Sequence, residues 1–267
     1  MKKYWSFFKM RLMAGLQYRA AAMAGMSTQF VWGAMEILLY RAFWAEHPGQ
    51  FPMGMEALSS YIWLQQAFLT LFAMWNWEHD ILRSVKEGTV AYELLRPTDI
   101  YSMWMARSVA NRLARASLRM VPVLVVASFI PAPYGLRLPA SPAAFALFLL
   151  ASVLMVLVVC SYHLLVYALT FYLTDPNGLM VLSVAAADLL GGAIVPLPFL
   201  PDGLRQFAQL TPFGSMQNVP LRIFSGSISL AQAPSVMGLQ VFWIITLLSA
   251  GYLLTKKGLR RAVILGG

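Results

Sequence analysis

The sequence predicts an all-α protein that crosses a membrane six times, and two features of its composition support this fold class. Hydrophobic residues make up 59% of the 267 positions and charged residues only 12%, whereas a soluble domain carries about 25% charged residues. The apolar residues also fall in long runs, such as 143–159 and 241–254, which a bilayer solvates better than water does. We therefore expect a single transmembrane domain over residues 1–267.

Residues 1–19 are expected to form a helix that lies in the headgroup plane of the membrane. Apolar side chains recur there at helical spacing, and polar ones fall on the other side. The two sets are Trp5, Phe8, Leu12 and Leu16 against Lys2, Ser6, Lys9 and Gln17. A basic amphipathic helix with aromatic anchors is typical of a membrane surface. The alternative is a frayed cytoplasmic tail.

The six spans are separated by prolines, glycines and charged residues. They are predicted over residues 20–43, 58–77, 118–130, 142–173, a run that starts at 179, and 238–254. The second span is placed to end at Trp77 because tryptophan favours the membrane interface. Ser141 and Pro142 form a cap and first-turn pair for the fourth span, and the turn sequence at 175–178 follows it.

Segment 78–119 is the most charged part of the chain, with seven of the twenty Lys and Arg residues. It is predicted to form a short helix, a turn at 96–99, and a second helix that continues into the third span. Arg112, Arg115 and Arg119 share one face of that second helix. The segment is either a solvated loop or a docking element for a cytoplasmic partner. Connections between helices are commonly short, so its length and helical pattern favour docking by residues 78–117.

The basic residues also predict the orientation of the chain. Sixteen of the twenty Lys and Arg residues lie in three segments, 1–19, 78–119 and 256–261. Basic residues favour the cytoplasmic side of a membrane, so all three segments are placed there. Both termini are then cytoplasmic, which requires an even number of spans: six, or four if the third and fifth runs do not cross.

The sequence contains no motif for catalysis. It has no phosphate-binding G-x-x-x-x-G-K-[ST] loop and no H-E-x-x-H pair, and His47, His79 and His163 are far apart. No catalytic residue, no metal site and no cofactor bound by this chain is predicted. The net charge of +9 does not indicate nucleic acid, because the basic residues cluster at the ends of apolar runs, beside lipid headgroups. Cys160 is expected to be a buried packing thiol.

Two carboxylates, Glu36 and Asp188, fall at membrane depth. Such an acid is a functional-site hypothesis, because burying an unpaired charge in a bilayer is costly. One interpretation is a proton or cation relay. The other is that each acid is neutral, paired or near an interface, with Glu36 close to Arg41. His163 is predicted to be a hydrogen-bonded packing residue.

The fifth apolar run breaks at Gly191 and Gly192 and is followed by Pro196, Pro198 and Pro201. Prolines at this density cannot continue a helix, and freed backbone groups at membrane depth are tolerated only inside protein or facing water. We predict a re-entrant outer hairpin over residues 190–224 that gates or shapes a pathway, with residues 203–224 amphipathic and interfacial. The alternative is a plain extracellular loop.

Together these segments resemble the membrane subunit of an ABC transporter of the ABC-2, or type V exporter, kind, over nearly the whole chain. Residues 86–97 are similar to the family's G-x(5)-L-L-R-P pattern in a cytoplasmic loop. Residues 191–212 are similar to its outer-hairpin signature. The resemblance implies that residues 78–100 act as a coupling helix. Its expected contact residues are Glu87, Gly88, Tyr92, Glu93, Leu94, Leu95, Arg96 and Pro97.

The resemblance further implies a non-catalytic permease subunit of an ATP-driven exporter in a bacterial-type plasma (inner) membrane. A separate ATPase dimer would bind ATP and Mg and dock on the coupling helix, and a second permease chain, identical or related, would complete the pathway. The substrate would be hydrophobic or amphipathic: a lipid, a peptide or a drug. The alternative is a proton- or ion-coupled secondary transporter that uses Glu36 and Asp188. The absence of a polar catalytic cluster argues against a membrane-embedded enzyme.

Overall fold

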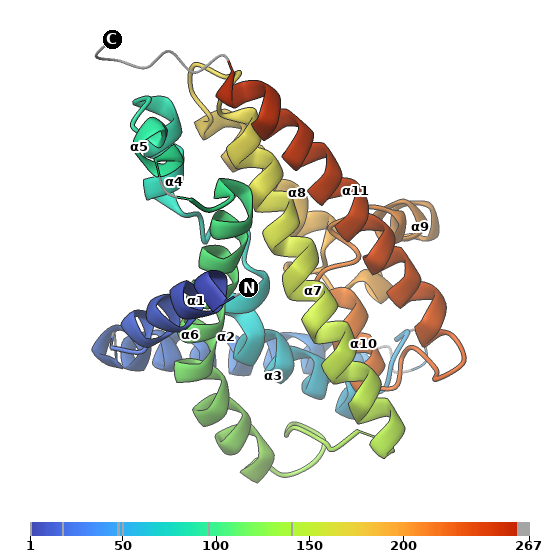
Figure 1. Cartoon of the computed structure of the whole chain (residues 1–267). Helices are drawn as coiled ribbons and strands as arrows, with labels where there is room; N and C mark the ends of the chain where they lie inside the picture. The colour runs from blue at the N-terminus through green and yellow to red at the C-terminus, as the bar shows by residue number, and fades with distance from the viewer. Residues whose placement is uncertain are drawn as a thin grey trace.

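The computed structural model describes residues 2–17, 19–46, 49, 51–95, 97–139 and 141–260. In these ranges the protein is helical throughout, with eleven α-helices and no strand (Figure 1). The helices are α1 (Lys2–Gly15), α2 (Arg19–Glu46), α3 (Met55–Phe72), α4 (His79–Lys86), α5 (Val90–Leu94), α6 (Ile100–Phe129), α7 (Pro142–Leu169), α8 (Asn177–Leu190), α9 (Asp202–Leu210), α10 (Asn218–Phe224) and α11 (Ala233–Leu259), with a short 3-10 helix, η2 (Leu197–Phe199), between α8 and α9. This confirms the all-α prediction.

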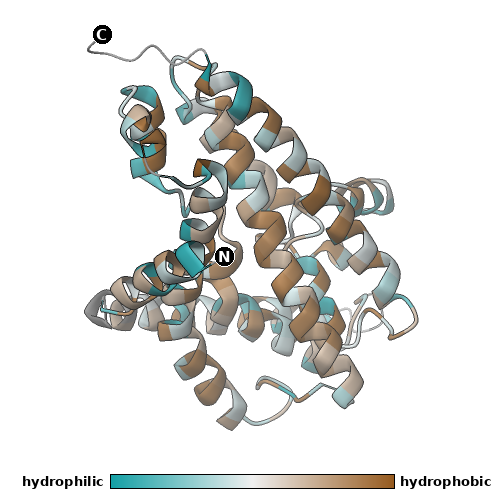
Figure 2. Ribbon diagram, viewed as in Figure 1, coloured by the Kyte–Doolittle hydropathy of each residue, from teal (hydrophilic) through white to brown (hydrophobic). Residues whose placement is uncertain are grey.

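Helices α7 and α11 run side by side and form the longest apolar pair (Figure 1). Gln240 of α11, which is fully buried, donates from Nε2 to the carbonyl of Ala151 on α7 at 3.2 Å and to that of Ser215 at 2.9 Å. Within the described ranges, these two helices combine the length and the hydropathy that a crossing requires. Figure 2 shows hydrophobic residues along both of them.

The predicted spans on α2, α3 and α6 are also helices, but polar side chains lower their hydropathy, whereas α8 is apolar but short. On α3, Gln65 and Gln66 are buried, and on α6 four arginines precede the apolar stretch. The exposed faces are nevertheless apolar: α2 exposes Val31, Trp32, Met35, Leu38, Leu39 and Phe43. Helices of this kind turn their polar groups toward protein and their apolar groups outward, which suits a bilayer. The count of six transmembrane helices stays a prediction.

The two ends of the bundle are marked by contacts between connections that are far apart in sequence. At one end lie α4 and α5, the loop after α7 and the end of α11: Lys86 Nζ is 3.8 Å from Asp175, and Tyr172 donates to the carbonyl of Leu254 at 2.9 Å (Figure 1). At the other end, Arg137 of the loop after α6 pairs with Glu56 of α3 at 2.6 Å. Helices α6, α7 and α11 therefore run between the two ends.

Several boundaries differ from the sequence prediction. Helix α3 ends at Phe72 rather than Trp77, because Arg112 binds the backbone carbonyls at its C-terminus; Trp77 is buried instead of lying at an interface. Helix α7 ends at Leu169 rather than at 173. Helix α10 is buried at six of its seven residues, which corrects the prediction that it is interfacial. The predicted continuity of the charged helix with the third span is confirmed by α6.

Helix α1 packs along α6 without burying any of its own residues. Its C-terminal Gly15 is so close to α6 that a Cβ there would lie 2.5 Å from Cβ of Ala114. Trp5 is 67% exposed and stacks on Phe8 with ring centroids 5.4 Å apart. An exposed tryptophan on a basic helix is typical of an interfacial helix, and the headgroup position of α1 stays a prediction.

Candidate functional site

Helices α4 and α5 form a compact hairpin, which we call the α4–α5 segment (residues 79–95). Helix α4 turns Ile81, Leu82 and Val85 inward, where all three are buried, and its polar residues face out. Gly88 ends the turn after α4 with a φ of 72°, a conformation that glycine adopts without steric cost. The glycine of the G-x(5)-L-L-R-P pattern therefore reverses the chain, and α5 begins two residues later.

The predicted coupling residues divide into two groups around this turn. Tyr92, Leu94 and Leu95 are exposed by 71%, 49% and 81%, and Glu87 and Pro97 are exposed beside them. Glu93 instead turns inward, where it accepts a hydrogen bond from the indole of Trp104 at 3.1 Å. Arg96 lies outside the described residues. The segment thus presents an apolar tip, defined here as Tyr92, Leu94 and Leu95, and is anchored through Glu93.

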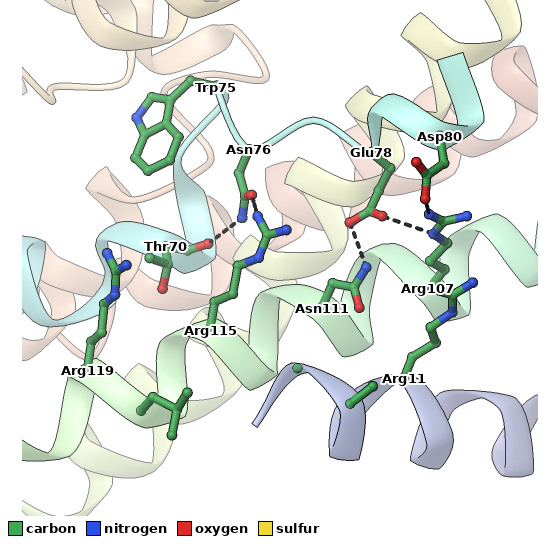
Figure 3. Close-up of a pocket in the computed structure, with 13 residues that line it drawn as sticks. Arg11, Thr70, Trp75, Asn76, Glu78, Asp80, Arg107, Asn111, Arg115 and Arg119 are labelled. Carbon is green, nitrogen blue, oxygen red and sulfur yellow. Dashed lines mark hydrogen bonds and ion pairs between the residues drawn. The ribbon is translucent and has the colours of Figure 1, made fainter. Parts of the chain in front are cut away.

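Hydrogen bonds among four polar residues connect the start of the α4–α5 segment to the bundle (Figure 3). We call this group the polar strut: Glu78, Asp80, Arg107 and Asn111. Arg107 of α6 donates to Glu78 at 2.9 Å and to Asp80 at 2.5 Å. Asn111, one turn further along α6, donates to the second oxygen of Glu78 at 2.8 Å. The backbone amide of Glu78 donates to the hydroxyl of Tyr167 on α7 at 2.9 Å. These charge-assisted bonds tie the start of α4 to α6.

Arg112, the residue after Asn111 on α6, caps the C-terminus of α3. Its guanidinium donates to the carbonyls of Leu71 at 2.9 Å and Ala73 at 3.0 Å and, more weakly, to that of Asn76 at 3.4 Å. The side chain is buried and forms no ion pair with any residue in the described ranges. The carbonyl end of a helix carries partial negative charge, so α3 itself stabilises this cation.

His163 of α7 completes the cap. Its Nε2 lies 3.1 Å from the carbonyl of Met74, and its Nδ1 lies 2.9 Å from a guanidinium nitrogen of Arg112. These contacts fit a neutral ring that donates to Met74 and accepts from Arg112. Trp77 stacks on the ring with centroids 4.1 Å apart. The contacts place His163 as the hydrogen-bonded packing residue that the sequence indicated, but its pairing with Arg112 was missed.

The glycine pair after α8 is held against the middle of α3. Gln65 donates to the carbonyl of Ala193 at 2.8 Å, and Gln217, just before α10, donates to that of Gly191 at 3.2 Å. Gly192 has a φ of 83°. Pro196 precedes η2, Pro198 lies within it and Pro201 precedes α9. Helix α8 has 14 residues and is too short to cross a hydrocarbon core of about 30 Å, in agreement with the predicted break.

Replacing Gly192 with valine is expected to destabilise the protein by about 2 kcal/mol, because a side chain in the left-handed region costs about 1–2 kcal/mol. The new Cβ would also lie 2.7 Å from Cδ1 of Leu197. Thermal unfolding of the purified chain in detergent measures the change. Gly203→Val, in the same hairpin but in open space, is the matched control. Equal unfolding temperatures for the two variants would show that the turn is not constrained.

The two acids do not come together. Glu36 on α2 has Gln66 and Tyr40 as polar neighbours, and its buried Oε1 has no hydrogen-bond partner within the described part of the chain. It does not pair with Arg41, whose guanidinium lies over the ring of Tyr134. Asp188 lies near the end of α8, half-buried beside Gly191. Neither acid forms an ion pair within the described ranges.

Comparison with known proteins gives one result that covers almost the whole molecule. Residues 25–266 match the family model described as ABC-2 family transporter protein. No curated protein matches the chain. The matched range includes α3 to α11, and therefore the α4–α5 segment, its strut and the hairpin. The chain thus belongs to the ABC-2 family, whose members are the membrane permease components of ABC transporters.

Proposed function

We propose that the chain is the permease subunit of an ATP-driven exporter and that the apolar tip is where a separate ATPase subunit docks. The observation that carries this proposal is the combination of the tip with the strut. Tyr92, Leu94 and Leu95 are exposed although they are apolar, while Arg107 and Asn111 fix the same segment to α6. Exposed apolar anchors with a polar rim are typical of a protein interface.

The strut would convert a motion of the ATPase into a motion of the membrane helices. A displacement of α4 pulls on Glu78, which is bonded to Arg107 and Asn111 of α6 and to Tyr167 of α7. Arg112 joins the end of α3 to the same two helices. Three helices would therefore respond together. Packed elements of this kind move as rigid bodies rather than bending.

The position of the α4–α5 segment sets the proposed orientation of the chain in the membrane. With an ATPase on the cytoplasmic side of a plasma membrane, the end of α11 and the start of α1 are cytoplasmic too, since Lys3 contacts the carbonyl of Pro97 and Tyr172 contacts Leu254. The hairpin over residues 190–224 then faces the outside as a re-entrant gate. The apolar faces of α2 and the apolar helices α7 and α11 suit a second permease chain and a hydrophobic or amphipathic substrate.

A secondary transporter that uses Glu36 and Asp188 is the competing function, and charge-removing variants separate the two. For the exporter we expect Glu36→Gln and Asp188→Asn to keep at least half of the ATP-dependent transport, because neither acid forms an ion pair with any residue that the structure describes. The assay follows a fluorescent amphipathic probe in proteoliposomes that contain the chain and its co-purified ATPase. Transport driven by a pH gradient without ATP, and abolished by Asp188→Asn, would instead establish the secondary transporter.

A further inference from the structure

A cavity of about 540 Å³ lies between α1, α6 and the connection that follows α3 (Figure 3). The cavity is separate from the apolar tip and from the hairpin over residues 190–224. Its charged lining consists of Arg11, Glu78, Asp80, Arg107, Arg115 and Arg119. Four guanidinium groups against two carboxylates leave a net charge of +2. A cavity of this size accommodates a small ligand, and the excess positive charge favours an anion.

Both carboxylates of the cavity are already engaged by Arg107, so neither is available to Arg11 or Arg115. Arg107 binds both Glu78 and Asp80. Arg115 donates to the side-chain carbonyl of Asn76, which is neutral. Arg11 Nε is buried, and its N–H has no hydrogen-bond partner among the residues that the structure describes. Burial, followed by the charge of Arg107, lowers the pKa of Arg11, although a guanidinium stays protonated in proteins.

The remaining walls of the cavity are apolar or aromatic and suit the part of a lipid that adjoins its headgroup. Ala14 and Gly15 of α1 and Leu118 of α6 form one side, and Trp75 is 51% exposed at another. Tryptophan is the residue that most favours the headgroup level of a membrane. Arg119 lies deeper on α6, with its guanidinium against the backbone of α2 at Gly25. The lining of the cavity therefore changes from the aromatic side chain of Trp75 at one side to a group of arginines at the other.

We propose that this cavity binds the phosphate of an anionic phospholipid from the leaflet in which α1 lies. Guanidinium groups bind phosphate oxygens through paired N–H donors, and basic pockets at a membrane surface select anionic headgroups. The bound phosphate would supply the acceptor that Arg11 Nε lacks. It would join α1 to α6 and to residues 75–80, which lead into the α4–α5 segment. The proposal rests on the proposed function only for the identity of that leaflet as the cytoplasmic one.

The test is a binding titration of the purified chain in neutral detergent, with no ATPase present. The unfolding midpoint is followed against dihexanoylphosphatidylglycerol, and the shift gives an apparent Kd. Dihexanoylphosphatidylcholine and inorganic phosphate are titrated in parallel. We expect phosphatidylglycerol to raise the midpoint, and Arg11→Gln and Arg119→Gln each to weaken its apparent Kd about fivefold. Arg11 lies on a helix without buried residues, so its replacement leaves the core intact.

Lys9→Gln is the matched control, because it removes the same charge from the same helix at an exposed position outside the cavity. It is expected to leave the apparent Kd unchanged. Equal effects of Lys9→Gln and Arg11→Gln, or equal midpoints with phosphatidylcholine, would overturn the proposal in favour of general surface charge. Inorganic phosphate that binds as tightly as phosphatidylglycerol would overturn the lipid assignment. Binding is measured without ATP, so this result stands or falls independently of the exporter function.

Discussion

Replacing Leu95 with aspartate is expected to remove the ATPase activity that co-purifies with the permease, while the permease itself stays folded. Leu95 is 81% exposed and lies at the end of the α4–α5 segment, so the substitution disturbs no internal packing. At a docked interface the same residue would be an apolar anchor, and the loss of an anchor costs about 2 kcal/mol or more. That corresponds to binding at least about 30-fold weaker. ATP hydrolysis in the affinity-purified complex measures the loss.

The matched control is Leu138→Asp, because Leu138 is 90% exposed on the loop at the opposite end of the bundle. It makes the same chemical change at a place where no ATPase is expected. Each variant is first checked for an unchanged unfolding temperature. If Leu95→Asp keeps the wild-type ATPase activity, or if Leu138→Asp loses as much, the apolar tip is not the docking surface.

Replacing Arg112 with methionine is expected to lower the free energy of unfolding by about 3 kcal/mol or more. Methionine fills much of the same volume but donates no hydrogen bond, so the carbonyls of Leu71 and Ala73 and the ring of His163 lose their partner. A buried acceptor left unsatisfied costs about 1–3 kcal/mol, and three are affected. The change is measured as the shift in reversible unfolding in detergent and denaturant.

Arg83→Met provides the comparison, because Arg83 is an exposed arginine on α4 and surface substitutions of this kind change stability by about 0.5 kcal/mol or less. Lysine at position 112 should recover part of the loss, since it keeps the charge but not the planar fork of donors. An Arg112→Met variant as stable as the wild type would mean that the α3 cap does not hold the connection to α4.

Much of the fold was predictable because it depends on local sequence. Ser141 caps α7 by accepting from the amide of Ala144 at 3.1 Å, and Asp99 caps α6 in the same way through Ser102 at 2.8 Å. The break at Gly191 is likewise set by neighbouring residues. Caps, prolines and glycines act within a few positions of the chain, so a single sequence contains the information that they require.

The candidate site was predictable only in outline, because its decisive contacts are distant in sequence. The sequence placed Arg112 and Arg115 on one face of a helix, but not the carbonyls of α3 that Arg112 binds. His163 is 51 residues from Arg112, and no local pattern reports that pairing. The same reason explains Trp77, which was expected at an interface because of its type and which stacks on His163 instead.

Site-specific photo-cross-linking from position 95 in native membranes tests the central claim most directly. A photoreactive phenylalanine analogue replaces Leu95 in one chain and Leu138 in another, and the adducts are probed for ATP binding with a photoreactive ATP analogue. We expect an adduct from position 95 that binds ATP and none from position 138. This expectation would be contradicted if position 95 gave no ATP-binding adduct while the same membranes transported substrate without ATP.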